Sequence, residues 1–97
     1  MSAYIIGQMT IHSSDWMEEY FSKIPAVVSS HQGTFKARGG NPQRMEGEAP
    51  LPDAAFIIEF PDRKHAEAFW NSAAFQELAI LRRTGSTLNA MLVDGVE

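Results

Sequence analysis

Both faces of the predicted strands are apolar, and this feature restricts the chain more than any other. Successive side chains of a strand point to opposite sides of its sheet. In the clearest strand, residues 53–60, the two rows are Phe56, Ile58 and Phe60 against Ala55, Ile57 and Glu59. The first strand gives Ile5, Met9 and Ile11 against Tyr4, Ile6, Gln8 and Thr10, and the last gives Leu88 and Leu92 against Met91 and Val93. Each side of the sheet therefore needs a cover.

The chain alternates between apolar segments and segments rich in turn-forming residues. Strands are predicted at residues 3–12, 34–38, 53–60 and 87–93, where β-branched and aromatic side chains are frequent. A helix follows the first strand, with Ser13, Ser14 and Asp15 as candidate N-caps, and a second helix begins at Asp62. The order β-α-β-β-α-β predicts a ferredoxin-like α+β fold, with a four-stranded antiparallel sheet in one domain of residues 1–97.

Local signals predict where these elements bend and end. Pro25 removes a backbone donor inside the first helix, so we expect a kink or a break there. Gly33 is expected to end this helix in a permissive conformation. Gly39 and Gly40 are expected to end or bulge the second strand. Ser72 interrupts the second helix and is expected to cap its continuation.

Two helices can cover only one side of a four-stranded sheet. Nothing else in the chain supplies a second cover, and a large exposed apolar patch is a liability for a monomer. We therefore expect a homodimer whose sheets pack face to face about a two-fold axis, which forms a dimeric α+β barrel. The proline-rich segment 41–52 is predicted to be a loop, which either covers a pocket or reaches the partner subunit.

The composition excludes several classes of function. The chain has no cysteine, which excludes disulfides, thiolate metal sites and cysteine nucleophiles. Its 12 acidic and 8 basic residues give a net charge of −4, which opposes binding to nucleic acid or anionic membranes. The strand at 53–60 also lacks the basic residues that RNA-recognition domains require. No apolar run approaches the ~20 residues of a membrane span, and no signal-peptide pattern is present. We expect a soluble, cytoplasmic protein.

Several motifs resemble those of the DUF1330 family. They are HQGTFKARGG at 31–40, EG at 46–47, IEFP at 58–61, FWNS at 69–72 with FQ at 75–76, and LVDG at 92–95. The resemblance extends over roughly residues 3–96, and the charged run DRK at 62–64 is a departure from the family pattern. It implies a dimeric α+β barrel built from two ferredoxin-like sheets. It implies no reaction, because the family is one of unknown function.

Arg38 and Glu59 are the first two candidates for chemistry. Arg38 precedes a glycine pair, where a ligand can approach the backbone, and its planar guanidinium can clamp a carboxylate or enolate. The alternative is a salt bridge from Arg38 to Glu46 or Glu59. Glu59 interrupts an apolar strand, and an inward carboxylate is either paired or has a raised pKa. It is therefore either a catalytic general base or part of an ion pair at the dimer interface.

The remaining candidates lie on or beside the helices. His31 follows the first helix, and it either moves a proton near neutral pH or hydrogen-bonds the last helical carbonyls. Tyr20 and Trp70 are predicted on inner helix faces, where they belong to the core or line a pocket against the sheet. No two histidines have the spacing of metal ligands on one helical face, so no metal is expected. No phosphate-binding glycine loop or dinucleotide fingerprint is present, so no cofactor is expected.

Two functions are compatible with the sequence. In the first, the protein binds or converts a small aromatic or carboxylated metabolite without a cofactor. Its ligand-binding residues are then Arg38, Tyr20, Glu46 and Trp70, and its proton-transfer residues are His31 and Glu59. In the second, the protein is a non-catalytic dimerisation or regulatory module, and the same charged residues only stabilise the interface.

Overall fold

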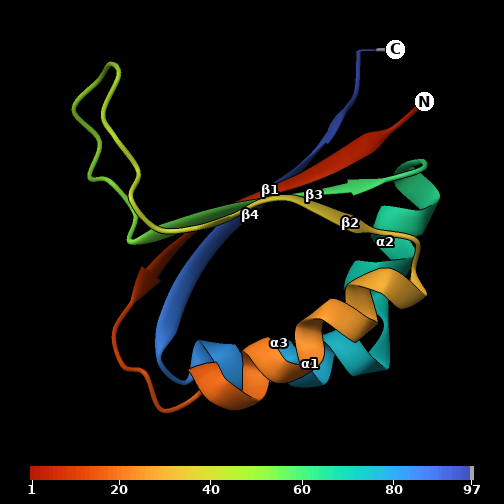
Figure 1. The fold of residues 1–97 in the computed structure, drawn as a ribbon, viewed down its shortest axis with the longest axis horizontal. Helices are drawn as coiled ribbons and strands as arrows, with labels where there is room; N and C mark the ends of the chain where they lie inside the picture. Colours follow the sequence, from red (N-terminus) through yellow and green to blue (C-terminus); the bar gives the residue numbers. More distant parts are fainter. Residues whose placement is uncertain (97) are drawn as a thin grey trace.

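A four-stranded antiparallel sheet carries three helices on one side (Figure 1). The computed structural model describes residues 1–96, so the last residue of the predicted domain lies outside the described residues. The elements are β1 (Ala3–Ile11), α1 (Met17–Ser30), β2 (Thr34–Gly39), β3 (Ala54–Phe60), α2 (Arg63–Asn71), α3 (Ala73–Arg83) and β4 (Ser86–Asp94). The strands lie in the order β2-β3-β1-β4. This arrangement confirms the predicted ferredoxin-like α+β fold, with the second helix divided in two.

Side-chain caps define where α2 and α3 begin. Asp62 Oδ1 accepts a hydrogen bond from the backbone N–H of His65 at 2.9 Å. Ser72 Oγ accepts one from the backbone N–H of Phe75 at 3.2 Å. Each cap satisfies a donor that has no partner within its own helix. The predicted caps at Asp62 and Ser72 are confirmed, and the extended backbone of Ser72 separates the two helices.

The helix α1 begins later than predicted. Its N-cap is Trp16, which makes no side-chain cap hydrogen bond, so the prediction of a cap at 13–15 is wrong. The Trp16 side chain is buried and packs on Gly85, where an added Cβ would lie 2.8 Å from Nε1 of the indole. Burial of this large ring therefore positions the first turn in place of a polar cap.

No break occurs at Pro25, which lies inside the continuous helix α1. Proline removes a single backbone donor, while the buried residues Ile24 and Val28 hold both sides of the helix on the core. At the end of α1, Gln32 rather than Gly33 adopts the left-handed conformation, with φ 63°. Gly33 is needed for close packing instead, because a Cβ there would lie 2.7 Å from the Phe60 ring.

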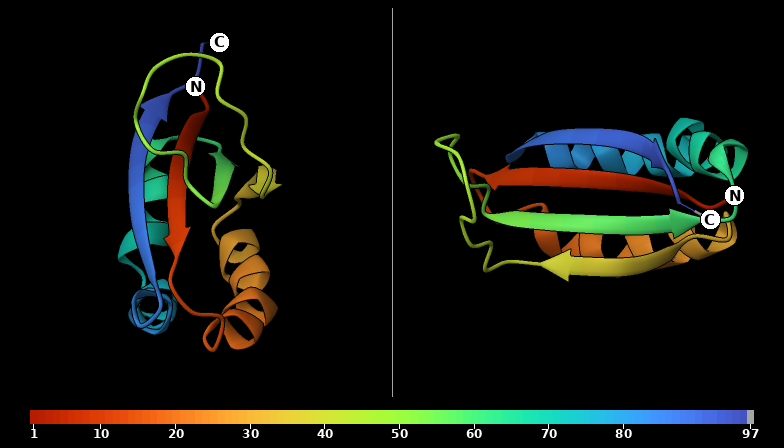
Figure 2. Two further views of the ribbon diagram at one scale, coloured as in Figure 1. Left: turned by 90° about the vertical axis from the view of Figure 1, so that its left-hand side faces the viewer. Right: turned by 90° about the horizontal axis from the view of Figure 1, so that it is seen from above.

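The two faces of the sheet have different surroundings. The face toward the helices carries the core, which includes buried Ile5, Met9, Ile58 and Phe60. On the opposite face, the register places Ala37, Ile57, Ile6 and Met91 in one row across all four strands. We call this row the open-face row. No element within residues 1–96 covers this face of the sheet (Figure 2). Met91 is 60% exposed.

The segment between β2 and β3, residues 40–53, projects beyond the end of the sheet (Figures 1 and 2). Arg44 holds it in shape by donating hydrogen bonds to the carbonyls of Gly47 at 2.6 Å and Ala49 at 2.9 Å. Met45 and Leu51 are 87% and 47% exposed. Figure 1 shows this segment rising on the side of the sheet away from the helices, so it does not cover the space between the sheet and the helices.

Candidate functional site

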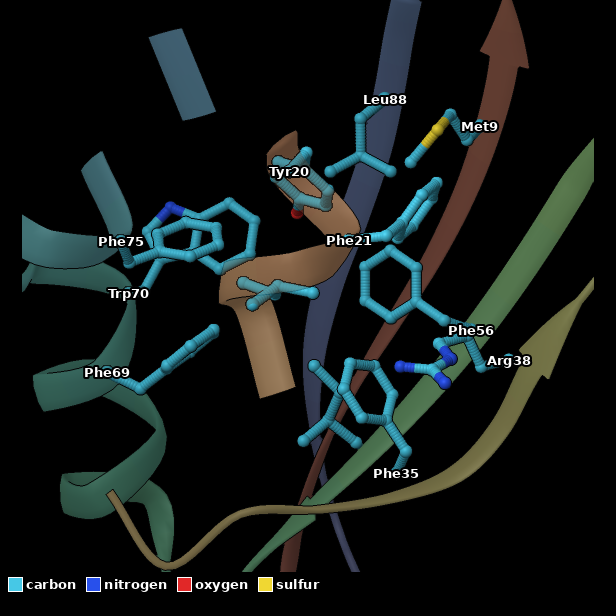
Figure 3. A pocket seen from close by; sticks show the side chains of 12 residues that line it. Met9, Tyr20, Phe21, Phe35, Arg38, Phe56, Phe69, Trp70, Phe75 and Leu88 are labelled. Atoms are coloured by element: carbon cyan, nitrogen blue, oxygen red, sulfur yellow. The ribbon is translucent and has the colours of Figure 1, made fainter. Parts of the chain in front are cut away.

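An apolar cleft lies between the sheet and the helices, and we call it the central cleft (Figure 3). The backbone of α1 packs against α3 rather than against a strand, so large side chains fill the space between. The lining residues are Met9, Tyr20, Phe21, Ile24, Phe35, Arg38, Phe56, Ile58, Phe69, Trp70, Phe75 and Leu88. The cavity volume is about 30 Å³, room for one or two water molecules. A larger ligand must therefore displace side chains at the edge, where Phe21 is 38% exposed.

A β-bulge in β2 directs Arg38 into this cleft. Phe35 pairs with Ile58, but the register then shifts so that Arg38 pairs with Phe56. Simple alternation would place Phe35 and Arg38 on opposite faces. The extra residue, Lys36, instead brings both side chains to the helix side, as bulges beside functional sites often do. Of the two predicted alternatives at Gly39 and Gly40, the end of the strand is confirmed, since β2 ends at Gly39, and the bulge lies earlier, at Lys36.

Arg38 is the single charged residue among those that line the cleft. Its Cζ lies 4.8 Å from the centroid of the Phe35 ring, a cation–π contact that holds the guanidinium at the edge of the cavity. None of the salt bridges within residues 1–96 includes Arg38, so the predicted alternative of a salt bridge to Glu46 or Glu59 is not formed. Its charge remains available to a ligand.

The cleft has room because Gly7 has no side chain. Gly7 lies between Phe56 and Ala90 in the register. The distal edge of the Phe56 ring lies over Gly7, where a Cβ would collide with it. On the other side of the cleft, the rings of Phe69 and Trp70 lie 4.5 and 4.6 Å from that of Phe75, centroid to centroid. Figure 3 shows these three rings facing Phe35, Arg38 and Phe56.

Tyr20 and Trp70 both line the cleft, together with Arg38. The Tyr20 ring makes an edge contact with Trp16, with centroids 5.4 Å apart. Burial raises the pKa of Tyr20, and the nearby positive charge of Arg82 partly opposes this effect. The phenol is therefore protonated at neutral pH and can donate a hydrogen bond.

Arg82 is a residue that the sequence analysis did not single out. Its place in the last turn of α3 suits the helix dipole, but the residue is only 1% exposed. The sequence does carry a signal that Arg82 is buried. The i, i+3, i+4, i+7 spacing of a buried helix face is followed by Phe75, Leu78, Ala79 and Arg82. Arg83, one residue later, is exposed.

Glu59 lies on the opposite face of the sheet from Arg38. Its carboxylate accepts a hydrogen bond from Tyr4 Oη at 2.9 Å and pairs with Lys36 Nζ at 3.4 Å. The Tyr4 hydrogen bond, helped by Lys36, lowers the pKa of Glu59. This contact fits the predicted alternative of an ion pair, with Lys36 rather than Arg38 as the partner. Arg38 cannot reach Glu59, because the bulge sends Arg38 to one face and β3 presents Glu59 on the other.

His31 and Glu46 also lie away from the cleft. His31 Nδ1 is 3.0 Å from the carbonyl oxygen of Val27, which fits the alternative of a histidine that binds the end of α1. Its ring also makes an edge contact with Phe69, with centroids 5.9 Å apart. Glu46 is exposed on the projecting segment. Of the predicted site residues, the structure brings together Arg38, Tyr20 and Trp70.

The other histidines have local partners. His12 Nε2 lies 2.9 Å from Thr87 Oγ1, and His65 Nδ1 lies 2.8 Å from Asp62 Oδ1. Over residues 1–96, no group of three or more His, Cys, Asp or Glu side chains is placed to hold a metal ion. None of the helices in this range is long and apolar enough to cross a bilayer.

The sequence matches a known family over almost its whole length. Residues 2–96 match the family described as "Domain of unknown function (DUF1330)". No curated protein matches the chain.

Solved structures with this fold come from several bacteria. RPA0582 from Rhodopseudomonas palustris, a protein of unknown function, superposes with a TM-score of 0.81 at 11% identity, covering 99% of this chain and 83% of its own. A dimeric ferredoxin-like protein of unknown function from Jannaschia sp. CCS1 superposes with a TM-score of 0.78 at 12% identity. The match covers 98% of this chain and 100% of that protein's chain. SnoaB from Streptomyces nogalater, a cofactor-independent oxygenase, superposes with a TM-score of 0.71 at 16% identity. The match covers 99% of this chain and 94% of the SnoaB chain. At these identities the similarity establishes the fold alone.

The position of Glu59 on the open face leads to a pH-dependent prediction. Because its pKa is lowered in the folded state, its contribution to stability is present above the unfolded pKa and disappears as the pH falls through the lowered one. Tyr4→Phe is expected to move the pKa of Glu59 back toward its ordinary value, as followed by NMR titration of the carboxyl carbon. Tyr20→Phe, on the other face, is the control and leaves this pKa unchanged. A Glu59 pKa that Tyr4→Phe does not move contradicts this placement.

Proposed function

Because the chain belongs to the DUF1330 family, for which no activity is established, we propose its function from the central cleft itself. The protein binds a small aromatic or other apolar metabolite that carries an acidic group. Its apolar part enters between the sheet and the helices, and its acidic group pairs with Arg38. Conversion of this metabolite without a cofactor, the type of activity for which SnoaB is named, is the finer form of the proposal.

The position of Arg38 carries this proposal. Ligand pockets are typically apolar with a few polar groups that fix orientation. Here eleven of the twelve lining residues are uncharged, and within residues 1–96 Arg38 has no carboxylate partner. A guanidinium binds a carboxylate through two parallel hydrogen bonds. His31, Glu46 and Glu59 do not line the cleft, so the proposal gives them no role in binding.

Binding of benzoate tests the role of Arg38. Arg38→Met keeps the length of the side chain and removes its charge, so we expect benzoate to bind about five- to tenfold more weakly, the value of one charge-assisted contact at a partly exposed site. Benzyl alcohol, which has no charge, should lose little affinity. The measurement is isothermal titration calorimetry at constant ionic strength.

The matched control is Lys36→Met, which removes the cation of the neighbouring residue on the opposite face. It should leave benzoate affinity unchanged. Equal losses in Arg38→Met and Lys36→Met would mean that only the overall charge matters and would contradict the proposal. If neither benzoate nor benzyl alcohol bound the wild type, the dimerisation module would be the better interpretation.

We also propose that a second copy of the chain covers the open-face row. The row runs across all four strands, from Ala37 through Ile57 and Ile6 to Met91, and nothing within residues 1–96 lies over it. The projecting segment rises on the same side (Figure 1), where it would flank a partner sheet. A dimer is also the named assembly of the structurally similar protein from Jannaschia. The two sheets would then pack face to face.

A charge placed in the open-face row tests this assembly. We expect the wild type to sediment at twice its chain mass at micromolar concentration. Ile57→Lys should sediment as a folded monomer, because a lysine in the middle of an apolar interface cannot be paired. Ile80→Lys is the control, since Ile80 is 65% exposed on α3, away from the sheet. A wild type that is monomeric, or a dimer that persists in Ile57→Lys, contradicts the proposed interface.

A further inference from the structure

Within the described part of the chain, Arg82 is a buried cation without an anionic partner. It lies in the last turn of α3, is 1% exposed, and its Nε–H finds no hydrogen-bond acceptor among residues 1–96. None of the ion pairs within residues 1–96 includes it. Removing a charge from water is unfavourable unless an opposite charge and hydrogen bonds compensate. A fold that retains such a residue keeps a positive charge where an apolar side chain would be more favourable.

The Tyr20 side chain lies beside Arg82. Arg82 Cζ lies 6.0 Å from the centroid of the Tyr20 ring, and the positive charge of Arg82 opposes the rise in the Tyr20 pKa that burial causes. A guanidinium has donors and no acceptor. Toward Arg82 the Tyr20 oxygen can therefore only accept a hydrogen bond, so its own proton is left for another acceptor. Tyr20 lines the central cleft, so a bound molecule can supply that acceptor.

The charges around the cleft are all of one sign. Among its lining residues, Tyr20 and Arg38 are the only groups that titrate or carry charge, and Arg82 stands behind Tyr20. The strands β1, β3 and β4 and the helices α2 and α3 contribute only uncharged side chains to the lining. No carboxylate in this lining competes for the hydroxyl proton. The site is therefore suited to negative charge on the ligand.

We propose that Tyr20 and Arg82 form an oxyanion site in the central cleft, so that the ligand is a phenol or enol bound as its anion. This rests on the proposed function, because it requires that the cleft takes up a ligand. Tyr20 donates its proton to the ligand oxygen in a hydrogen bond. Arg82 acts through Tyr20 as a positioning residue: it holds the phenol in place and polarises its O–H bond. Hydrogen bonds of this kind to a charged oxygen are about twice as strong as neutral ones.

The probe for this site is 4-nitrophenol, whose absorbance distinguishes the neutral from the ionised form. An apolar cleft alone would favour the neutral phenol, since burial raises the pKa of an acid. We expect the bound probe to be ionised in the wild type, with a pKa lower by about one unit or more than in Arg82→Met. Tyr20→Phe, which deletes only the hydroxyl oxygen, should likewise bind 4-nitrophenol in its neutral form. The measurement is an absorbance titration with pH at saturating protein.

Two controls separate this site from other effects. Arg83→Met removes the exposed neighbouring arginine and should leave the bound probe ionised. 4-Nitroanisole, which cannot ionise, should bind Arg82→Met as well as it binds the wild type. The melting temperature of unliganded Arg82→Met should be equal to or above that of the wild type, since an unpaired buried charge is removed.

The outcomes separate this inference from the proposed function. A bound probe that is neutral in the wild type, or that stays ionised in Arg82→Met, overturns the oxyanion site but not the cleft. Failure of the wild type to bind either 4-nitrophenol or 4-nitroanisole overturns both. A lower melting temperature in Arg82→Met, with the probe still ionised, would show that Arg82 has a structural role only. If Arg82→Met does not fold, Tyr20→Phe decides the question.

Discussion

The β-bulge at Lys36 determines which side of the sheet each residue of β2 faces. Before it, Phe35 faces the helices; after it, Ala37 faces away and Arg38 faces the helices. This shift brings Arg38 to the central cleft, where its guanidinium stacks on Phe35. It also places Ala37 and the ion pair of Lys36 with Glu59 on the open face. Because the pleat has a period of two residues, a β2 without the bulge would take Arg38 out of the cleft. The chemistry of both faces depends on this one irregularity.

The sheet separates two surfaces of different character. On the helix side, large aromatic residues line the space between the helices and the sheet, and Gly7 provides space beneath Phe56. The resulting cleft combines apolar walls with the positive charge of Arg38 and the hydroxyl of Tyr20. On the other side, the open-face row offers an apolar surface for association. A substitution on one face of the sheet can therefore be tested without altering the side chains on the other face.

The fold could be predicted from the sequence further than the site could. Alternating apolar rows, together with the caps at Asp62 and Ser72, are local patterns that the structure follows closely. The bulge could not be placed, because which residue of β2 is left unpaired depends on the register with β3 rather than on β2 alone. The face of Glu59 could not be assigned for the same reason, since the alternation gives two rows but not which row the helices cover. For Arg82, the buried spacing was visible, but a basic residue in a last helical turn is equally well explained by the helix dipole.

Methyl NMR of the wild type with added benzoate tests most directly whether ligands enter the central cleft. Met9, Ile58 and Leu88 line the cleft, whereas Ile6, Ile57 and Met91 belong to the open face. Ligand entry predicts saturable shifts of the first three methyl groups and none of the second three. Shifts confined to Ile6, Ile57 and Met91, or no saturable shifts at all, would contradict a binding site between the sheet and the helices.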